Sequence, residues 1–157
     1  MKRSRAVKDT VTEAKNYIYR LLKIRIRSER EVRDKLRQKG FSEPTADEAV
    51  GYFKGIDLIN DRLFTQKWIA WRLVKPFGLK RIKLELKEKG VAPELIEEQF
   101  TETKSDYPEE EIVARLAKRR AAKHSGVPRE KMKQRVYGCL MRRGFNPAVV
   151  FKAIKNI

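Results

Sequence analysis

The sequence predicts an all-α protein made of three tandem three-helix repeats in an elongated array. The first observation is a short segment at residues 36–41 that recurs at 86–91 and 140–145. Each copy has Leu, then Gly four residues later, then an apolar residue. The second observation is that the glycines lie 50 and 54 residues apart, a period typical of helical repeats. The third is that strand-like alternation is absent from the sequence.

Each copy of the segment has the pattern of a helix ending. A glycine after the last helical turn can adopt the left-handed conformation, which lets the following residue pack on the Leu of that turn. We therefore expect Gly40, Gly90 and Gly144 to occupy equivalent left-handed positions.

Residues 1–9 are expected to form a short basic arm, and repeat 1 is predicted over residues 10–59. Thr10 with Glu13, and Ser28 with Glu31, have the spacing of a capping box and predict two helix starts. Ser42 is the expected N-cap of a third helix with proline in its first turn.

Repeat 2 is predicted over residues 60–104, with Asn60 as the first N-cap. Residues 75–78 interrupt the helical pattern, and Pro93 begins a third helix that runs to about Phe100. Polar residues 101–107 are the expected linker. The buried face of the first helix is expected to comprise Leu63, Phe64, Trp68, Trp71 and Leu73.

Repeat 3 is predicted over residues 105–157. Pro108 opens its first helix, and the three glutamates that follow suit the positive end of a helix. Residues 125–128 form a turn, and Asn146 with Pro147 marks the start of the last helix.

The chain is strongly basic, with a formal net charge of +17 and a pI near 10.2. Residues 20–39 contain nine Lys/Arg against three Asp/Glu, and residues 115–143 contain eleven against one. Intrahelical pairs such as Glu31 with Lys35 explain part of this pattern, but they do not explain the imbalance in repeat 3. A polyanionic partner is expected. The predicted DNA phosphate-binding residues are Arg25, Arg33, Arg37, Arg119, Arg120, Lys123 and Arg135.

Catalytic and cofactor motifs are absent from the sequence, so a non-enzymatic protein without cofactors is expected. Cys139 lies in an apolar helical setting and is predicted to be a reduced, buried thiol. His124 is interpreted as a capping or solvated residue. Asp57 and Asp61 could hold Mg²⁺ as in a nuclease, but Asn60 and Asp61 fall at a helix start, which favours a structural role or a protein contact. Trp68 and Trp71 could stack on bases, although helical spacing favours the core.

The N-terminal segment lacks an apolar stretch behind its charges, and no stretch approaches the length of a membrane span. We therefore expect a cytoplasmic protein without membrane contact, and a monomer.

Several of these motifs, in their order and spacing, resemble those of the bacterial RecX regulatory proteins. The motifs are Ser28-x-x-Glu31-Val32-x-x-Lys35-Leu36-x-x-Lys39-Gly40-Phe41, Leu58-Ile59-Asn60-Asp61-x-x-Phe64, Arg72, and Gly78-x-x-Arg81-Ile82-x-x-Glu85-Leu86-x-x-Lys89-Gly90-Val91. Thr65 stands where the family usually has Ala. The resemblance implies a curved helical protein that binds the RecA recombinase and its filament on DNA. It also implies modulation, usually inhibition, of recombination and of the SOS response.

The resemblance and the central position of repeat 2 suggest a recombinase-binding surface there. Its predicted residues are Asp61, Arg72, Lys75, Lys80, Arg81, Lys83 and Lys87. The alternative is a stand-alone basic DNA-binding protein, for which single- or double-stranded DNA is a largely non-specific partner. A nuclease is the third possibility.

Overall fold

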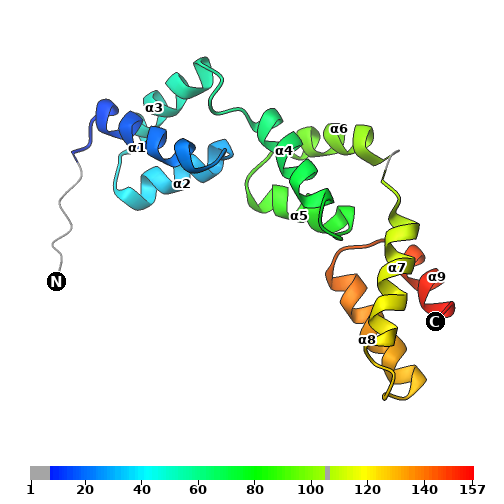
Figure 1. Ribbon diagram of the computed structural model, residues 1–157. Helices are drawn as coiled ribbons and strands as arrows, with labels where there is room; N and C mark the ends of the chain where they lie inside the picture. The colour runs from blue at the N-terminus through cyan, green and yellow to red at the C-terminus, as the bar shows by residue number, and fades with distance from the viewer. Residues whose placement is uncertain (1–7, 105–106) are drawn as a thin grey trace, which may run out of the picture.

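The computed structural model describes residues 8–104 and 107–157, and this part of the chain contains nine α-helices and no strand. The helices form three consecutive triplets, as Figure 1 shows. Repeat 1 contains α1 (Val11–Ile24), α2 (Glu29–Lys39) and α3 (Glu43–Gly55). Repeat 2 contains α4 (Asp61–Leu73), α5 (Leu79–Glu88) and α6 (Pro93–Lys104). Repeat 3 contains α7 (Glu109–Ala122), α8 (Arg129–Arg142) and α9 (Pro147–Lys155). The predicted all-helical fold is confirmed.

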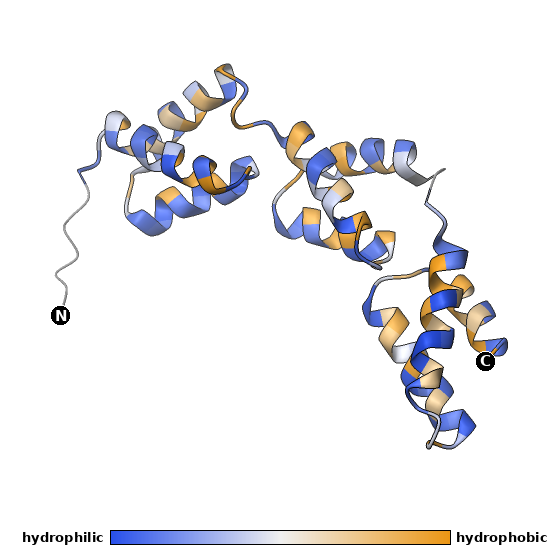
Figure 2. Ribbon diagram, viewed as in Figure 1, coloured by the Kyte–Doolittle hydropathy of each residue, from blue (hydrophilic) through white to orange (hydrophobic). Residues whose placement is uncertain are grey.

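Each repeat packs its own apolar core. The most buried side chains include Ile18, Leu36 and Val50 in repeat 1, Phe64, Leu86 and Ile96 in repeat 2, and Val113, Leu140 and Val150 in repeat 3. Figure 2 shows these apolar segments on the facing sides of each triplet and hydrophilic residues along the outer sides of the helices. A stable triplet therefore does not depend on a core shared with its neighbour.

The three glycines have the predicted left-handed conformation, with φ of 98° at Gly40, 76° at Gly90 and 78° at Gly144. In repeats 1 and 2 the residue after the glycine donates its N–H to the carbonyl of Leu36 or Leu86, at 3.1 Å in both cases. This is the longer hydrogen bond of a Schellman cap, and it fixes where α2 and α5 end.

Most of the predicted N-caps are also present. Ser28 and Glu31 form a complete capping box, and the Asn60 side chain accepts from the Leu63 N–H at 2.9 Å. The Thr10 side chain accepts from the Glu13 N–H at 3.3 Å. Ser42 occupies the N-cap position of α3, but its hydroxyl bonds to the Thr45 hydroxyl instead of capping the helix.

Two predictions about repeat 2 are wrong. Leu63 and Trp71 lie outside the core, with 39% and 50% of their surface exposed, whereas Thr65 is fully buried. The Thr65 hydroxyl donates to the Asp61 carbonyl at 2.7 Å, which satisfies this polar group inside the repeat. In addition, α6 continues to Lys104, so most of the predicted linker is helical. Residues 1–7 of the predicted arm and residues 105–106 lie outside the described part of the chain.

The repeats join through the second helix of each triplet. Between repeats 1 and 2, the Ser28 hydroxyl at the start of α2 donates to the Lys89 carbonyl at the end of α5, at 2.6 Å. Between repeats 2 and 3, the Gly78 N–H at the start of α5 donates to the Arg143 carbonyl at the end of α8, at 2.8 Å. Each joint therefore brings the negative end of one helix dipole onto the positive end of another.

Close backbone packing at the joints requires glycine. A Cβ on Gly78 would lie 2.1 Å from the Gly144 carbonyl oxygen, and a Cβ on Gly144 would lie 2.4 Å from the Arg81 nitrogen. The three triplets follow an arc in Figure 1, and the joints between them set this curved shape. Helices α2, α5 and α8 lie on the inner side of the arc, and α3, α6 and α9 lie on the outer side.

Candidate functional site

The inner side of the arc is lined by the helices that carry much of the positive charge. Within α2, α5 and α8 the sequence places 14 Lys/Arg and 6 Asp/Glu. The three repeats differ in how far these cations are neutralised by carboxylates of the chain itself.

In repeat 1 the predicted phosphate-binding arginines are engaged within the chain. The Arg25 guanidinium donates two hydrogen bonds to Glu31, at 3.0 and 2.9 Å. The other ion pairs join Arg33 to Glu29 and Asp47, and Arg37 to Asp34 and Glu43. A phosphate at these positions would have to compete with a carboxylate that is already in place.

Glu31 also ties repeat 1 to repeat 2, because Lys89 reaches it at 2.8 Å. Burial alone would raise the pKa of the Glu31 carboxyl, but the hydrogen bonds from Arg25 and Lys89 outweigh it and lower the pKa to about 2. The predicted pair of Glu31 with Lys35 does not form, since Lys35 bonds to Gln38 instead. Glu31 is therefore a structural acid at the first joint.

In repeat 2 the most buried cation is Arg72, whose side chain is only 11% exposed. It forms an ion pair with Glu85 and lies over the Phe77 ring, 4.0 Å from the ring centroid. Glu85 also accepts from Trp68 at 3.2 Å and from Arg81 at 3.1 Å. Burial would raise the pKa of Glu85, yet the Arg72 and Arg81 hydrogen bonds hold it below its usual value. Arg72 therefore belongs to the interior of the repeat.

The remaining residues predicted to bind a recombinase fall into two groups. Lys80 and Lys87 are exposed and have no carboxylate partner in the described ranges 8–104 and 107–157. Lys83 is paired with Glu97 at 2.6 Å, and Lys75 lies over the Trp71 ring at 4.7 Å.

Asp61 is half-buried and accepts the Glu29 N–H at 2.8 Å. Burial raises its pKa, and this hydrogen bond opposes the rise. Asp61 thus links the starts of α2 and α4, in agreement with the interpretation of this carboxylate as a capping or contact residue.

Repeat 3 is different, because its cations are largely unpaired. Within residues 107–157 one ion pair is present, between Lys152 and Glu110 at 2.9 Å. On α7, Leu116, Arg119, Arg120 and Lys123 have the spacing i, i+3, i+4 and i+7, so they share one face of the helix. Three cations therefore stand in a row beside one apolar residue.

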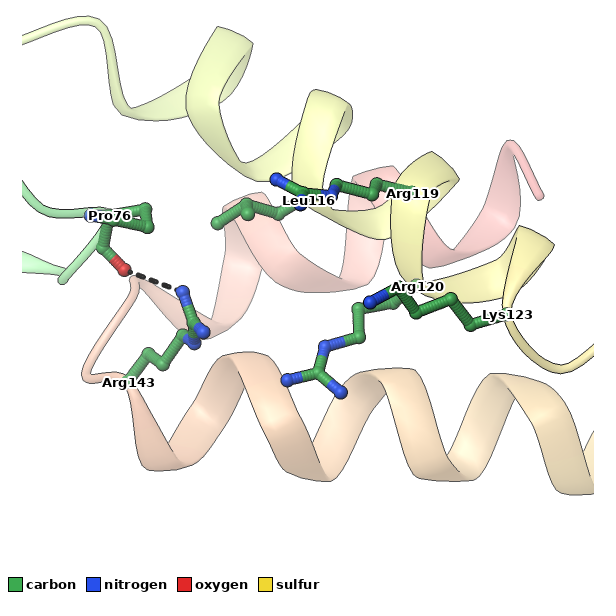
Figure 3. A pocket seen from close by; sticks show the side chains of 6 residues that line it. All are labelled: Pro76, Leu116, Arg119, Arg120, Lys123 and Arg143. Atoms are coloured by element: carbon green, nitrogen blue, oxygen red, sulfur yellow. Dashed lines mark hydrogen bonds between the residues drawn. The ribbon is translucent and has the colours of Figure 1, made fainter.

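This face of α7 forms a pocket of about 210 Å³ together with Arg143 and Pro76. Figure 3 shows Arg120 reaching from α7 toward α8, and the Arg143 guanidinium bonded to the Pro76 carbonyl, at 3.2 Å. The Arg143 guanidinium also lies 5.9 Å from the Phe77 ring centroid. The pocket therefore lies at the joint between repeats 2 and 3.

A second pocket, of about 450 Å³, shares Arg120 with the first. On α8 it is lined by Arg135, Gly138, Cys139 and Arg142, again with the spacing i, i+3, i+4 and i+7. Cys139 is only partly buried and lies among arginines, so the prediction of a buried thiol is wrong. His124 also lines this pocket.

The structure thus brings together all four predicted phosphate-binding residues of repeat 3, which are Arg119, Arg120, Lys123 and Arg135. Sequence reasoning missed Arg142 and Arg143 because they belong to the repeated helix ending and were interpreted as part of it. The spacing of Arg135 and Arg142, two turns apart on either side of Gly138, is a signal that could have identified the second pocket.

The described residues contain neither a candidate membrane span nor a candidate metal site. No helix among them is long and apolar enough to cross a membrane. In the same residues, no group of three or more His, Cys, Asp or Glu side chains is placed to hold a metal ion.

Family models of the first, second and third three-helix domains of RecX match residues 14–53, 60–98 and 108–154 of this chain. The chain belongs to the RecX family. The third match shows that membership extends through repeat 3, where the sequence motifs are weakest. The confirmed resemblance therefore covers all three repeats.

Individual RecX proteins are similar to this chain over most of their length. Regulatory protein RecX of Haemophilus influenzae (strain PittEE) is 33% identical over 131 residues, which cover 83% of this chain and 85% of the relative. Regulatory protein RecX of Amycolatopsis mediterranei is 31% identical over 146 residues, covering 92% and 82%. The crystal structure of RecX from Lactobacillus salivarius has the same fold, with a TM-score of 0.77, 23% identity and coverage of 93% and 95%. A regulatory role of the RecX type follows from the curated relatives.

Proposed function

We propose that this RecX-family protein binds the RecA recombinase filament on DNA and inhibits its recombinase and ATPase activity. The observation that carries the proposal is the match of all three repeats to RecX, whose curated members are named regulatory proteins. The protein acts by binding, without a cofactor and without catalysing a reaction of its own.

The shape and charge of the molecule fit such a partner. A recombinase filament presents acidic protein surface and DNA phosphate along a continuous groove, and an arc of stacked repeats can follow a groove. The inner helices of the arc carry the excess of positive charge, which attracts both kinds of surface.

Repeat 2 contributes the protein contact in this proposal. Lys80 and Lys87 are exposed on α5 at the centre of the inner side and have no carboxylate partner in the described part of the chain. They are therefore available to acidic residues of an assembled recombinase. Arg81 and Lys83, which already hold Glu85 and Glu97, keep α5 in position beside them.

The test is the steady-state rate of ATP hydrolysis by RecA on single-stranded DNA, with and without this protein. The double variant Lys80→Glu with Lys87→Glu is expected to lose inhibition while its far-UV helical signal and melting temperature stay unchanged. The matched control is Lys67→Glu with Lys155→Glu, which reverses two exposed lysines on α4 and α9. Full inhibition by the α5 variant would contradict the proposed contact.

The alternative function is stand-alone DNA binding, which the unpaired cations of repeat 3 favour. The two functions differ in the affinity for bare DNA compared with recombinase-coated DNA. Filament recognition predicts tighter binding to the coated DNA at equal salt concentration. Equal affinity for both would favour the alternative.

A further inference from the structure

We propose that the groove between α7 and α8 binds the phosphodiester backbone of a single polynucleotide strand, with one phosphate in each of its two pockets and Arg120 between them. This inference deepens the function proposed above, because it supplies the DNA contact of a protein bound to a recombinase–DNA filament. The evidence for the strand-binding groove is the geometry of repeat 3, and the binding experiments that test it use no recombinase.

The smaller pocket has the chemistry of a phosphate site. Its four cations, Arg119, Arg120, Lys123 and Arg143, offer only donors, and no carboxylate lines the pocket. Guanidinium groups bind phosphate oxygens in pairs through their planar fork of N–H groups. Arg143 is already oriented by its hydrogen bond to Pro76, so less of its side-chain freedom is lost when an anion binds.

The larger pocket is lined by Gly138, a glycine in the interior of α8. Glycine at an interior helical position is less favourable than alanine, so the residue is not explained by helix stability. A Cβ on Gly138 would meet only the Arg142 guanidinium, at 3.3 Å, so the backbone does not require glycine. The absence of a side chain leaves space between Arg135 and Arg142.

Arg120 lines both pockets and therefore connects them. Two neighbouring pockets lined by donors can receive two phosphates of one backbone, and a flexible single strand can bring its phosphates into such recesses. A duplex presents its phosphates on a convex surface and fits such recesses less well. Neither pocket contains an aromatic residue on which a base could stack, so the proposed contact is to the phosphates and does not depend on base sequence.

The first test is fluorescence anisotropy of a labelled oligothymidylate strand titrated with the full-length protein over a range of salt concentrations. Arg120→Gln is expected to lower the affinity roughly tenfold. It should also reduce the slope of log affinity against log salt by up to about 1.4, because each phosphate contact with a single strand contributes about 0.7. The matched control is Lys118→Gln, which removes one positive charge from the same helix outside both pockets.

The second test blocks the groove without changing its charge. Gly138→Leu fills the larger pocket and is expected to weaken strand binding about fivefold, whereas Gly138→Ala is expected to bind as the wild type does. Melting temperatures of both variants check folding, and Arg120→Gln provides an independent test that leaves the backbone unchanged. Wild-type binding by folded Gly138→Leu, or equal losses in Arg120→Gln and Lys118→Gln, would overturn the proposal in favour of diffuse charge attraction.

Competition identifies the source of the anion. Unlabelled strand is expected to displace the label at far lower concentration than a duplex of the same length, sodium triphosphate or polyglutamate. Equal displacement by polyglutamate would reassign the groove to an acidic protein surface, and equal displacement by triphosphate would reassign it to free phosphates. Strand binding as expected, without inhibition of ATP hydrolysis by RecA, would contradict the proposed recombinase function. The proposed strand-binding groove would still be supported.

Discussion

In repeat 1, carboxylates of α2 and α3 hold the arginines that precede and line α2, whereas in repeat 3 the arginines of α7 and α8 face each other across open pockets. Residues 10–59 contain 11 Lys/Arg against 8 Asp/Glu, and residues 105–157 contain 13 against 5. One cause is the third helix of the triplet. Helix α3 supplies Glu43 and Asp47 to neighbouring arginines, but α9 contains no acidic residue.

Both repeats nevertheless have the same three-helix arrangement and a well-buried core. The fold therefore depends on apolar packing and helix caps rather than on neutralised charge. Exposed ion pairs contribute little to stability, which agrees with this view. An unpaired set of cations raises self-repulsion, so its presence in repeat 3 indicates an anionic partner.

The largest difference between repeats 1 and 3 is expected in the free energy of unfolding, when the glycines that end α2 and α8 are replaced. Gly144→Ala should destabilise the protein by more than about 3 kcal/mol, because the new Cβ would overlap Arg81 in addition to the strain of positive φ. Gly40→Ala should cost only about 1 kcal/mol, since nothing lies within 4 Å of its Cβ position. Urea unfolding followed by far-UV circular dichroism measures both.

A control for these glycine variants is Gly51→Ala in α3, which has ordinary helical geometry and open space. It should stabilise the protein by about 0.5 to 1 kcal/mol. Equal losses for Gly40→Ala and Gly144→Ala would show that the joint between repeats 2 and 3 does not form in solution.

The second prediction separates the two sets of predicted phosphate-binding residues by DNA affinity. Neutralising the repeat 3 set should weaken single-strand binding roughly 100-fold, or about 2.8 kcal/mol, and lower the salt slope by at least about 1.4. Neutralising the repeat 1 set should change the slope by less than about 1, because those arginines are held by carboxylates. The repeat 3 set is Arg119, Arg120, Lys123 and Arg135, and the repeat 1 set is Arg25, Arg33 and Arg37. An equal fall in slope for both sets would remove the contrast between the repeats.

Acid should weaken the first joint before it affects repeat 3. Because the folded-state pKa of Glu31 is about 2, below the ordinary value of 4.5, its stabilisation is complete above about pH 4.5 and is lost as the pH falls toward 2. The expected loss is on the order of 2 kcal/mol. Melting temperatures between pH 6 and pH 2 should therefore fall less steeply in Glu31→Gln, which is already destabilised at pH 6, than in the wild type. Parallel curves would contradict this role of Glu31.

The smallest expected effect is the change in free energy of unfolding when a single arginine is replaced by glutamine. Arg33→Gln should cost about 1 kcal/mol, since it leaves Glu29 and Asp47 without their shared partner. Arg120→Gln should change stability by less than about 0.5 kcal/mol or increase it slightly, because it relieves repulsion. Chemical denaturation at low ionic strength distinguishes the two, and a larger loss for Arg120→Gln would indicate a structural role that its surroundings do not show.

The parts of the fold that could be predicted are those encoded locally. The left-handed Gly40, Gly90 and Gly144 and the capping box of Ser28 with Glu31 each depend on residues within one turn of the chain. The segregation of charge is also visible in the sequence, and the four cations that it singles out in repeat 3 line two adjoining pockets.

The errors arise where a distant residue decides the outcome. Arg72 is buried because Glu85, thirteen residues away, accepts its guanidinium, and this partner is invisible to a helical pattern. Arg25 and Lys89 meet at Glu31 across the first joint, a contact set by how two repeats stack. Trp71 matched the apolar spacing of α4, yet the core is completed by Phe64 and Ile69 instead.

The joints are heterologous contacts, in which one surface receives a different surface of the next unit, and contacts of this kind can generate open fibres when they repeat. The start of α8 disfavours such repetition. Met132 lies twelve residues before Gly144, the position that Ser28 and Gly78 hold before their own glycines. An extra turn of α8 places the Met132 N–H on the Pro128 carbonyl, at 2.9 Å. The backbone donor that would receive the Gly40 end of another molecule is therefore already bonded within α8, so we expect these joints to form within one molecule and not between molecules.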